Sequence, residues 1–218
     1  QEVLARFGLP VDAAALARPL IGMVTRLVDQ KGLDLIRGAR EALTRMEAAF
    51  VVLGTGERAN EEMWREMAAE CPTRIGVQVG FDERLAHLIE GGADLFLMPS
   101  RFEPCGLNQM YSMRYGTVPV VRATGGLVDT VQPFDPRTGD GTGFMFRDYT
   151  SSAMLWALET ALAVFKNPAR WRALQLAGMR QDFSWDAAAA VYVQEYRRAI
   201  ERRLEAVDED EDERTNRG

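Results

Sequence analysis

The sequence contains few of the residues on which several classes of protein depend. Its 218 residues include two cysteines, Cys71 and Cys105, and one histidine, His87. Two cysteines make no disulfide framework, and no second pair has the spacing of a zinc site. No stretch approaches the ~18 uninterrupted apolar residues that a membrane span needs, and no secretory apolar region opens the chain. The sequence therefore predicts no membrane partner and a reducing compartment, which would be a bacterial cytoplasm or a plastid stroma.

An excess of basic residues is also lacking. The formal net charge is −6, and residues 208–218 (DEDEDERTNRG) contribute −4 of it, which leaves −2 for the rest of the chain. A nearly neutral body lacks the basic field that nucleic-acid binding usually requires. We therefore expect no nucleic-acid partner, and we expect residues 205–218 to form a disordered acidic tail.

What is present is typical of a globular domain. Apolar residues make up 47% of the chain and charged residues 27%, which is an ordinary globular composition. The length suits one large domain or two small ones. Because the chain opens on QEVLARFGLP without an initiator methionine, we expect it to be a fragment of a longer protein.

Short apolar runs alternate with stretches of helical periodicity. Five such runs read as strands, at residues 19–25, 50–54, 74–80, 94–100 and 118–123. Near-continuous apolar strands separated by helices predict a parallel sheet that is covered on both faces. We therefore predict a doubly wound, Rossmann-like α/β domain over residues 19–204, preceded by a linker over residues 1–18. Its last helix is expected over residues 185–204, with Ser184 as its cap.

The loop after the first strand carries two cations. Arg26 stands at the strand end, and Lys31 follows five residues later, just before a helix. In a parallel α/β sheet, ligands bind beyond the carboxyl ends of the strands. A guanidinium and an ammonium at that edge suit a diphosphate, although two surface cations would give the same local sequence.

The loop after the fourth strand combines a carboxylate with the start of a helix. Glu103 is followed by Gly106, Leu107 and Asn108, whose free N–H groups would face the crevice at the helix's positive end. Such a helix start binds phosphate, and a neighbouring carboxylate accepts hydrogen bonds from sugar hydroxyls. After the fifth strand, the glycines Gly125 and Gly126 form a turn whose bare backbone could approach a ligand closely.

A competing motif follows the second strand. Gly54 and Gly56 begin a G-x-G-x-x-A pattern, and Asp82 lies where a ribose-binding acid would stand in a dinucleotide site. Against that interpretation, the motif follows the second strand instead of the first, and Glu57 and Glu61 would bring negative charge to a pyrophosphate. A dinucleotide-binding oxidoreductase domain is therefore the less favoured alternative.

Several of these segments together resemble the bacterial glycogen synthases and plant starch synthases. The resemblance runs from about Pro19 to Leu204, through TRLVDQKGLDL, IGVQVGFDE, GGADLFLMPSRFEPCGLNQMY, YGTVPVVRATGGLVDTV and DFSW. Those retaining transferases have two Rossmann-type domains of the GT-B type and elongate an α-1,4-glucan from a nucleotide-diphosphate glucose. This sequence is similar to their C-terminal, donor-binding half, and it lacks the K-x-G-G-L motif of the N-terminal half.

The resemblance implies a role for each candidate residue. Arg26 and Lys31 would bind the diphosphate of ADP-glucose and stabilise the leaving ADP, and Glu103 would hold the glucose. The amides of residues 106–108 would bind a phosphate, and Phe81 would stack on the adenine, unless it is an ordinary core phenylalanine. Further residues expected near the substrate are Gly54, Gly56, Cys105, Gly125 and Gly126.

Other residues receive structural interpretations. His87 is expected to be structural, and Cys105 has no nearby histidine that would activate it as a nucleophile. Position 111, where the wider retaining pattern has a second glutamate, is Tyr111, which leaves a ribose carboxylate in doubt. No ligand cluster indicates a metal or another cofactor. Glu103 also lacks the acidic partner that a hydrolase needs.

The sequence thus predicts the ADP-glucose-binding half of a retaining glucosyltransferase. Its partners would be the α-1,4-glucan acceptor and a missing N-terminal domain, and the fragment alone would be inactive. By the resemblance, the last helix would pack partly against that missing domain, so that some of its apolar face would be exposed here. The sequence leaves open a non-catalytic nucleotide- or sugar-binding module.

Overall fold

The computed structural model describes the backbone of residues 1–215 and the side chains of residues 1–203. The chain forms two compact units, Gln1–Gln181 and Asp182–Gly218. The first unit contains the sheet and the candidate site. The second contains the helix α10 (Trp185–Thr215), and residues 216–218 lie outside the described part.

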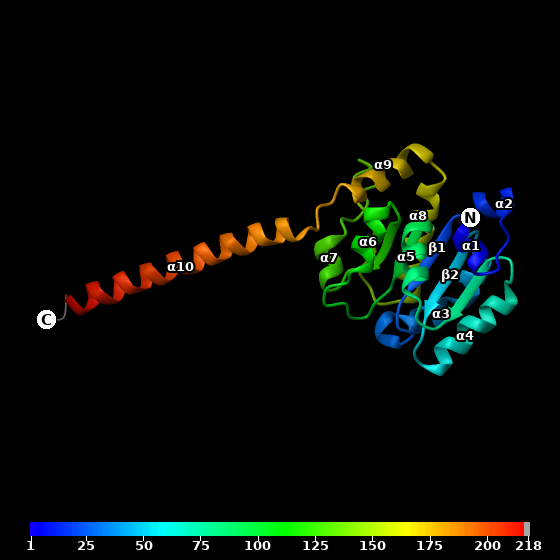
Figure 1. The fold of residues 1–218 in the computed structure, drawn as a ribbon, viewed down its shortest axis with the longest axis horizontal. Coiled ribbons are helices and arrows are strands. Elements are labelled where there is room, and N and C mark those ends of the chain that lie inside the picture. Colours follow the sequence, from blue (N-terminus) through cyan, green and yellow to red (C-terminus); the bar gives the residue numbers. More distant parts are fainter. Residues whose placement is uncertain (216–218) are drawn as a thin grey trace. The chain divides into compact units, whose positions relative to one another are not determined.

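A parallel sheet of six strands lies at the centre of the first unit (Figure 1). In the described residues, the spatial order of the strands is β3-β2-β1-β4-β5-β6. The strands are β1 (Leu20–Val24), β2 (Ala49–Gly54), β3 (Ile75–Val79), β4 (Leu95–Met98), β5 (Val118–Arg122) and β6 (Phe144–Phe146). This is the strand order of doubly wound dinucleotide-binding folds, and it confirms the predicted fold class.

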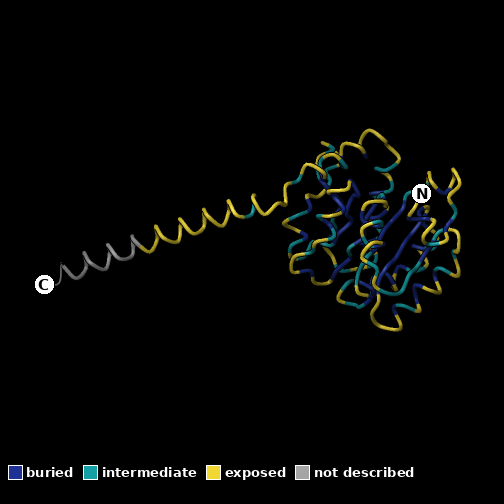
Figure 2. Tube along the Cα trace, in the orientation of Figure 1, coloured by how far each residue is buried: buried dark blue, intermediate teal, exposed yellow. Residues whose placement is uncertain are grey.

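Helices cover both faces of this sheet. They are α1 (Glu2–Arg6), α2 (Ala13–Ala17), the 3-10 turn η1 (Asp29–Lys31), α3 (Leu33–Arg45), α4 (Arg58–Glu70), α5 (Glu83–Gly92), α6 (Asn108–Tyr115), α7 (Gly126–Thr130), α8 (Ser151–Phe165) and α9 (Pro168–Met179). Val52 of β2 is buried in one core cluster with α3, α4 and α8, whereas its neighbour Val51 is buried in another with α1 and α5. Successive strand residues point to opposite faces, which explains the continuous apolar runs. Figure 2 shows the strands as the most buried part of this unit.

The helix starts follow from local sequence. The side chains of Asp82, Thr150 and Asn167 accept hydrogen bonds from the first turns of α5, α8 and α9. Ser184 does the same for α10, where the N–H of Ala187 donates to its Oγ at 3.3 Å. These side chains satisfy amide groups that have no acceptor within the helix.

The first eighteen residues differ from the expected linker. They form α1 and α2, and the α1 residues Val3 and Leu4 are buried in a core cluster with Leu85 and Ile89 of α5. Apolar residues at positions 3, 4 and 9 give this segment its own contact with the core. The segment therefore belongs to the first unit.

The other domain boundary also differs from the expectation. The first unit ends at Gln181, so the last helix falls in the second unit. Its backbone is helical through Thr215, where residues 205–218 were expected to be disordered; residues 216–218 lie outside the described part. Alanine, glutamate and arginine recur through residues 187–206 and have high helix propensity, which favours the helix up to the start of the acidic run.

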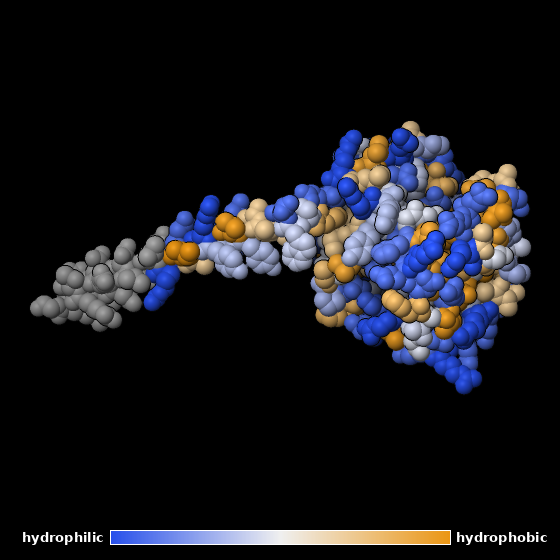
Figure 3. Space-filling view, in the orientation of Figure 1, coloured by the Kyte–Doolittle hydropathy of each residue, from blue (hydrophilic) through white to orange (hydrophobic). Residues whose placement is uncertain are grey.

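Helix α10 exposes apolar residues that are spaced four apart in the sequence. Tyr192, Tyr196 and Ile200 are exposed, and Leu204, the next position in this spacing, has no described side chain. Figure 3 shows apolar residues among hydrophilic ones along this helix. In the described residues, no helix is both long enough and apolar enough to cross a membrane.

Candidate functional site

A pocket of about 370 Å³ opens at the carboxyl ends of four neighbouring strands. Its lining comes from the loops that follow β3, β2, β1 and β4. It includes Arg26, Lys31, Gly54, Phe81, Asp82, Ser100, Glu103, Gly106, Leu107 and Asn108. The connections from β1 and β4 run in opposite directions along the sheet, which leaves a crevice where ligands bind in this kind of fold.

Lys31 and Glu103 form an ion pair in this pocket. The Nζ atom of Lys31 lies 2.6 Å from Oε2 of Glu103, and both side chains are largely buried. Ser100 donates its hydroxyl to the same oxygen at 3.1 Å. No contact within the described chain involves Oε1 of Glu103, so this oxygen is available to accept hydrogen bonds from a ligand.

Arg26 lines the same pocket without an acidic partner. Among the described residues, no hydrogen bond or ion pair involves its guanidinium, and the side chain is exposed. The group therefore retains all its donors for an anion, and a guanidinium binds phosphate in a bidentate manner.

The start of α6 contributes backbone donors. In the described part of the chain, the N–H groups of Gly106, Leu107 and Asn108 have no protein acceptor. The side chain of Asn108 donates instead to the carbonyl of Val24 at 3.2 Å, which fastens the helix start to the end of β1. Amides without acceptors therefore line the same pocket as the two cations, and phosphate binding by them stays a prediction.

Phe81 projects into solvent at the pocket edge. Its side chain is 90% exposed, so it is not an ordinary core phenylalanine. An exposed aromatic ring beside a pocket offers a flat surface on which a base can stack.

The glycines after β5 lie close to the Glu103 loop. Gly125 and Gly126 do not line the pocket. A Cβ atom at Gly125 would lie 2.0 Å from the carbonyl oxygen of Glu103, and one at Gly126 would lie 2.3 Å from that of Cys105. The N–H of Gly126 already donates to the carbonyls of Glu103 and Pro104. The bare backbone therefore packs against the Glu103 loop.

Two further predicted residues lie outside the pocket lining. Gly56 packs against the backbone of Leu27, with a Cβ position 2.4 Å from the Leu27 carbonyl oxygen. Cys105 is exposed, and its sulfur lies near the carbonyl of Gly106. Gly54 does line the pocket, and its missing side chain leaves room for the carbonyl of Thr25.

Donors of the dinucleotide-like motif are already bonded to a side chain of the helix that follows it. Oε1 of Glu61 accepts hydrogen bonds from the N–H of Gly56 at 3.0 Å and from the hydroxyl of Thr55 at 2.9 Å. The Gly56 amide and then the Thr55 hydroxyl hold the pKa of this carboxyl below its usual range. Asp82, the candidate ribose acid, caps α5 and pairs with Arg6 at 3.5 Å. The position of a pyrophosphate in that motif is therefore occupied by a carboxylate.

The remaining candidates lie away from the reacting groups. His87 is outside the pocket lining, and its Nδ1 contacts Glu90 of the same helix at 2.9 Å. Tyr111 is also outside the lining, and its ring contacts that of His87. In the described residues, no group of three or more histidine, cysteine or acidic side chains is arranged to hold a metal ion.

Sequence reasoning missed Ser100, which is buried and orients Glu103. A serine three residues before a glutamate carries no signal of this contact until the loop is folded. It also missed the polar network around Tyr149, which is described below.

Comparisons with known proteins show the family to which the chain belongs. The family described as "Glycosyl transferases group 1" matches residues 11–173. Curated relatives include the glycogen synthase of Anaeromyxobacter dehalogenans, 55% identical over 190 residues, and that of Koribacter versatilis, 50% identical over 198 residues. These alignments cover 87% and 91% of this chain but only 39% and 40% of the relatives. The chain therefore spans about two fifths of their length.

Solved structures of two other proteins are similar to this chain. The catalytic domain of starch synthase IV from Arabidopsis thaliana, bound to ADP and acarbose, superposes with a TM-score of 0.78 at 36% identity. That match covers 92% of this chain and 42% of the other. A sucrose-phosphate synthase from Thermosynechococcus elongatus matches at 24% identity with a TM-score of 0.65, over 91% of this chain and 48% of the other, and shows the shared fold.

Proposed function

Because the chain belongs to the group 1 glycosyl transferases, we propose that its pocket binds ADP-glucose as the donor half of a retaining glucosyltransferase. The full reaction would move glucose to the nonreducing end of an α-1,4-glucan. In support, the curated relatives are named glycogen synthases, and the similar solved structure is a starch synthase bound to ADP and acarbose. The named relatives are bacterial, so the proposed location is a bacterial cytoplasm in preference to a plastid stroma.

One observation carries the proposal. Arg26 and the amides of residues 106–108 have no protein partner in the described chain, and they line the same pocket as the Lys31–Glu103 pair. Donors without acceptors suit a diphosphate, and a carboxylate with one free oxygen suits a sugar hydroxyl. A nucleotide-sugar has both groups, joined by the bond that breaks.

The chemistry follows from these positions. When the bond between glucose and the diphosphate breaks, negative charge develops on the leaving ADP, and Arg26, Lys31 and the α6 amides stabilise it. Oε1 of Glu103 accepts hydrogen bonds from the glucose and aligns it. A phosphate oxygen of the leaving ADP then accepts the proton of the attacking acceptor hydroxyl. The new bond from that hydroxyl oxygen to C1 of the glucose forms on the face that the phosphate leaves, which retains the configuration. In this proposal no metal is needed, because two cations and a helix start neutralise the diphosphate.

Transfer also requires the part of the relatives that this chain does not span. An open pocket on one domain holds the donor, but alignment with an acceptor and exclusion of water need a second surface. We therefore expect the 218-residue chain to bind donor and to transfer no glucose above background. In that sense it is a nucleotide-sugar-binding module until it is joined to the rest of the enzyme.

Calorimetry on the 218-residue chain tests the proposal. ADP and ADP-glucose should bind measurably, and NAD should bind no better than ADP, because Glu61 closes the motif that NAD would need. Titration with UDP compares the affinity for a uracil nucleotide with that for an adenine nucleotide. A folded chain that gives no binding heat with millimolar ADP would contradict the proposal, and tighter binding of NAD would favour the oxidoreductase alternative.

A further inference from the structure

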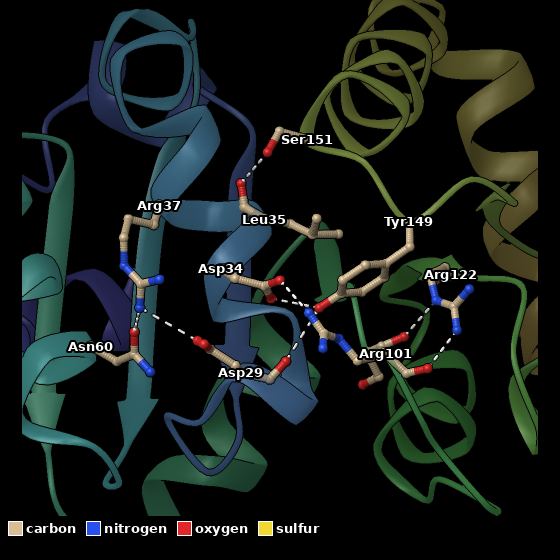
Figure 4. A network of polar contacts seen from close by, with 10 residues as sticks. Asp29, Asp34, Leu35, Arg37, Asn60, Arg101, Arg122, Tyr149 and Ser151 are labelled. Carbon is tan, nitrogen blue, oxygen red and sulfur yellow. Dashed lines mark hydrogen bonds and ion pairs between the residues drawn. The ribbon is translucent and has the colours of Figure 1, made fainter.

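A group of four side chains lies next to the pocket without lining it. Asp34, Arg101, Arg122 and Tyr149 contact one another at the carboxyl edge of the sheet (Figure 4), and we refer to them as the Tyr149 cluster. The proposed reaction uses none of them directly.

Tyr149 is the centre of the cluster. Its hydroxyl lies 2.5 Å from Oδ1 of Asp34 and 3.2 Å from the carbonyl oxygen of Asp29. The guanidinium carbons of Arg101 and Arg122 lie 4.7 Å and 5.2 Å from the centre of its ring. Burial, and then the hydrogen bond to Asp34, raises the pKa of this phenol, so the hydroxyl stays protonated and donates.

The two arginines fasten the loop after β4. Arg122 donates from Nε to the carbonyl of Ser100 at 2.8 Å and from Nη2 to that of Arg101. Arg101 donates from Nη2 to Oδ2 of Asp34 at 2.7 Å, and its N–H donates to the carbonyl of Gln30 at 2.9 Å. These hydrogen bonds thus hold backbone groups of both loops that flank the crevice.

These contacts join the segments that carry the two charged groups of the pocket. Asp29 and Gln30 directly precede Lys31, and Ser100 and Arg101 precede Glu103. Tyr149 follows β6, and Arg122 ends β5. The Arg101–Asp34 ion pair is substantially exposed, with side-chain exposures of 58% and 25%, and by itself would add little stability. What the cluster provides is a fixed distance between two loops.

We propose that Tyr149 is a positioning residue, which holds the Glu103 loop against the Asp29–Lys31 turn so that the diphosphate meets a preformed site. This proposal rests on the proposed function. A ligand that contacts both loops gains affinity from a site whose geometry is already fixed. The diphosphate contacts both loops, whereas the nucleoside would contact Gly54 and Phe81, which follow β2 and β3 outside the cluster.

The test compares Tyr149→Phe with Tyr192→Phe in the 218-residue chain. The first variant loses the hydroxyl and keeps the ring between the arginines, and the second removes a hydroxyl from an exposed tyrosine of α10. Affinity for ADP is measured by calorimetry and affinity for adenosine by ligand-observed NMR titration. Hydrogen–deuterium exchange follows the backbone amide of Arg101.

In Tyr149→Phe, ADP affinity should fall about 3- to 10-fold, as expected for the loss of one net hydrogen bond. Adenosine affinity should stay unchanged, and the Arg101 amide should exchange faster. Tyr192→Phe should match the unsubstituted chain in all three measurements.

Unchanged exchange with unchanged ADP affinity would overturn the proposal, and so would an equal loss of ADP and adenosine affinity together with a lower unfolding midpoint. If the unsubstituted chain binds no ADP, the proposed function fails. The exchange rate of Arg101 then still decides whether Tyr149 holds the loop.

Discussion

The Nζ atom of Lys31 lies 2.6 Å from Oε2 of Glu103, although 72 positions separate the two residues in the chain. Each group neutralises the charge of the other. Removing one partner leaves the other charge largely buried and uncompensated. The two residues therefore cannot be treated as independent binding groups.

Substitution of Glu103 should separate turnover from nucleotide affinity. In a longer chain that includes the missing part of the enzyme, Glu103→Gln should lower glucose transfer ~100-fold, because the glucose loses its alignment. ADP affinity should not fall, since Lys31 is released from its ion pair. Glu62→Gln, at an exposed pair on α4, serves as the control in the same radiochemical assay. A variant that loses ADP affinity but keeps its turnover number would show that Glu103 has another role.

Arg26→Ala should weaken ADP binding ~10-fold or more, the usual effect of losing a charge-assisted contact. Lys31→Ala should weaken it further, because Glu103 then faces the diphosphate without its counter-charge. The matched control is Arg45→Ala, which removes an arginine from an exposed pair at the end of α3. Calorimetry measures all three. Equal affinities for Arg26→Ala and the control would place the diphosphate elsewhere.

Phe81→Ala should reduce ADP affinity without reducing stability. Stacking of a base on an aromatic ring contributes ~1–3 kcal/mol, whereas a side chain that is 90% exposed contributes little to the core. Phe81→Trp should retain the affinity. Calorimetry and thermal unfolding separate the two effects, and a large drop in the unfolding midpoint would contradict this interpretation of Phe81.

Gly126→Ala should reduce both stability and ADP affinity. The added Cβ would lie 2.3 Å from the carbonyl oxygen of Cys105, so the Glu103 loop must shift. A methyl group forced against backbone atoms in this way costs ~1–3 kcal/mol. Gly91→Ala is the matched control, because its Cβ meets only the ring of Tyr115 at 3.4 Å or more. It should be neutral or stabilising within α5. If Gly126→Ala binds ADP normally, the contact does not set the position of the loop.

Glu90 should make stability depend on pH. Burial on α5 raises the pKa of this carboxyl, and the His87 contact opposes the shift. The folded state therefore holds the proton more tightly than the unfolded state. The stability from this group is full below its unfolded pKa and is lost as the pH rises through the folded pKa.

Glu90→Gln removes that dependence. Thermal unfolding is measured at pH values from ~4 to ~8, on either side of the ordinary carboxyl range. The unfolding midpoint of the variant, relative to that of the unsubstituted chain, should rise as the pH rises. A difference between the two midpoints that falls as the pH rises would contradict the raised pKa of Glu90.

Much of the fold was predictable because parallel strands leave a strong local pattern. Leu33, Ile36, Ala39 and Leu43, which follow one another at helical spacing in the sequence, are all buried. The strand β6 was missed, because its three residues, Phe144–Phe146, are too few to show periodicity. The rule that ligands bind at the carboxyl edge then located the pocket before any tertiary contact was known.

The site was only partly predictable. Arg26, Lys31, Glu103 and Phe81 line one pocket, as expected from their places at strand ends. Gly126 shows the limit of that reasoning, since a glycine-rich turn indicates close approach without telling whether a ligand or another loop approaches. The pairing of Lys31 with Glu103 depends on two loops meeting, and no local pattern encodes that distance.

The long sequence separations within the Tyr149 cluster have a consequence for folding. Asp34 and Tyr149 are 115 residues apart, and Ser151 donates to the carbonyl of Leu35 across 116. Contacts between residues so far apart in the sequence form late, because the chain between them must first lose conformational entropy. During synthesis, β1 and β4 can pair before residue 149 has left the ribosome, but the Asp29–Lys31 turn and the Glu103 loop then lack their shared anchor. A nascent chain should therefore reach its full affinity for ADP only after β6 and the start of α8 have been made, which makes full ADP affinity a late reporter of complete folding.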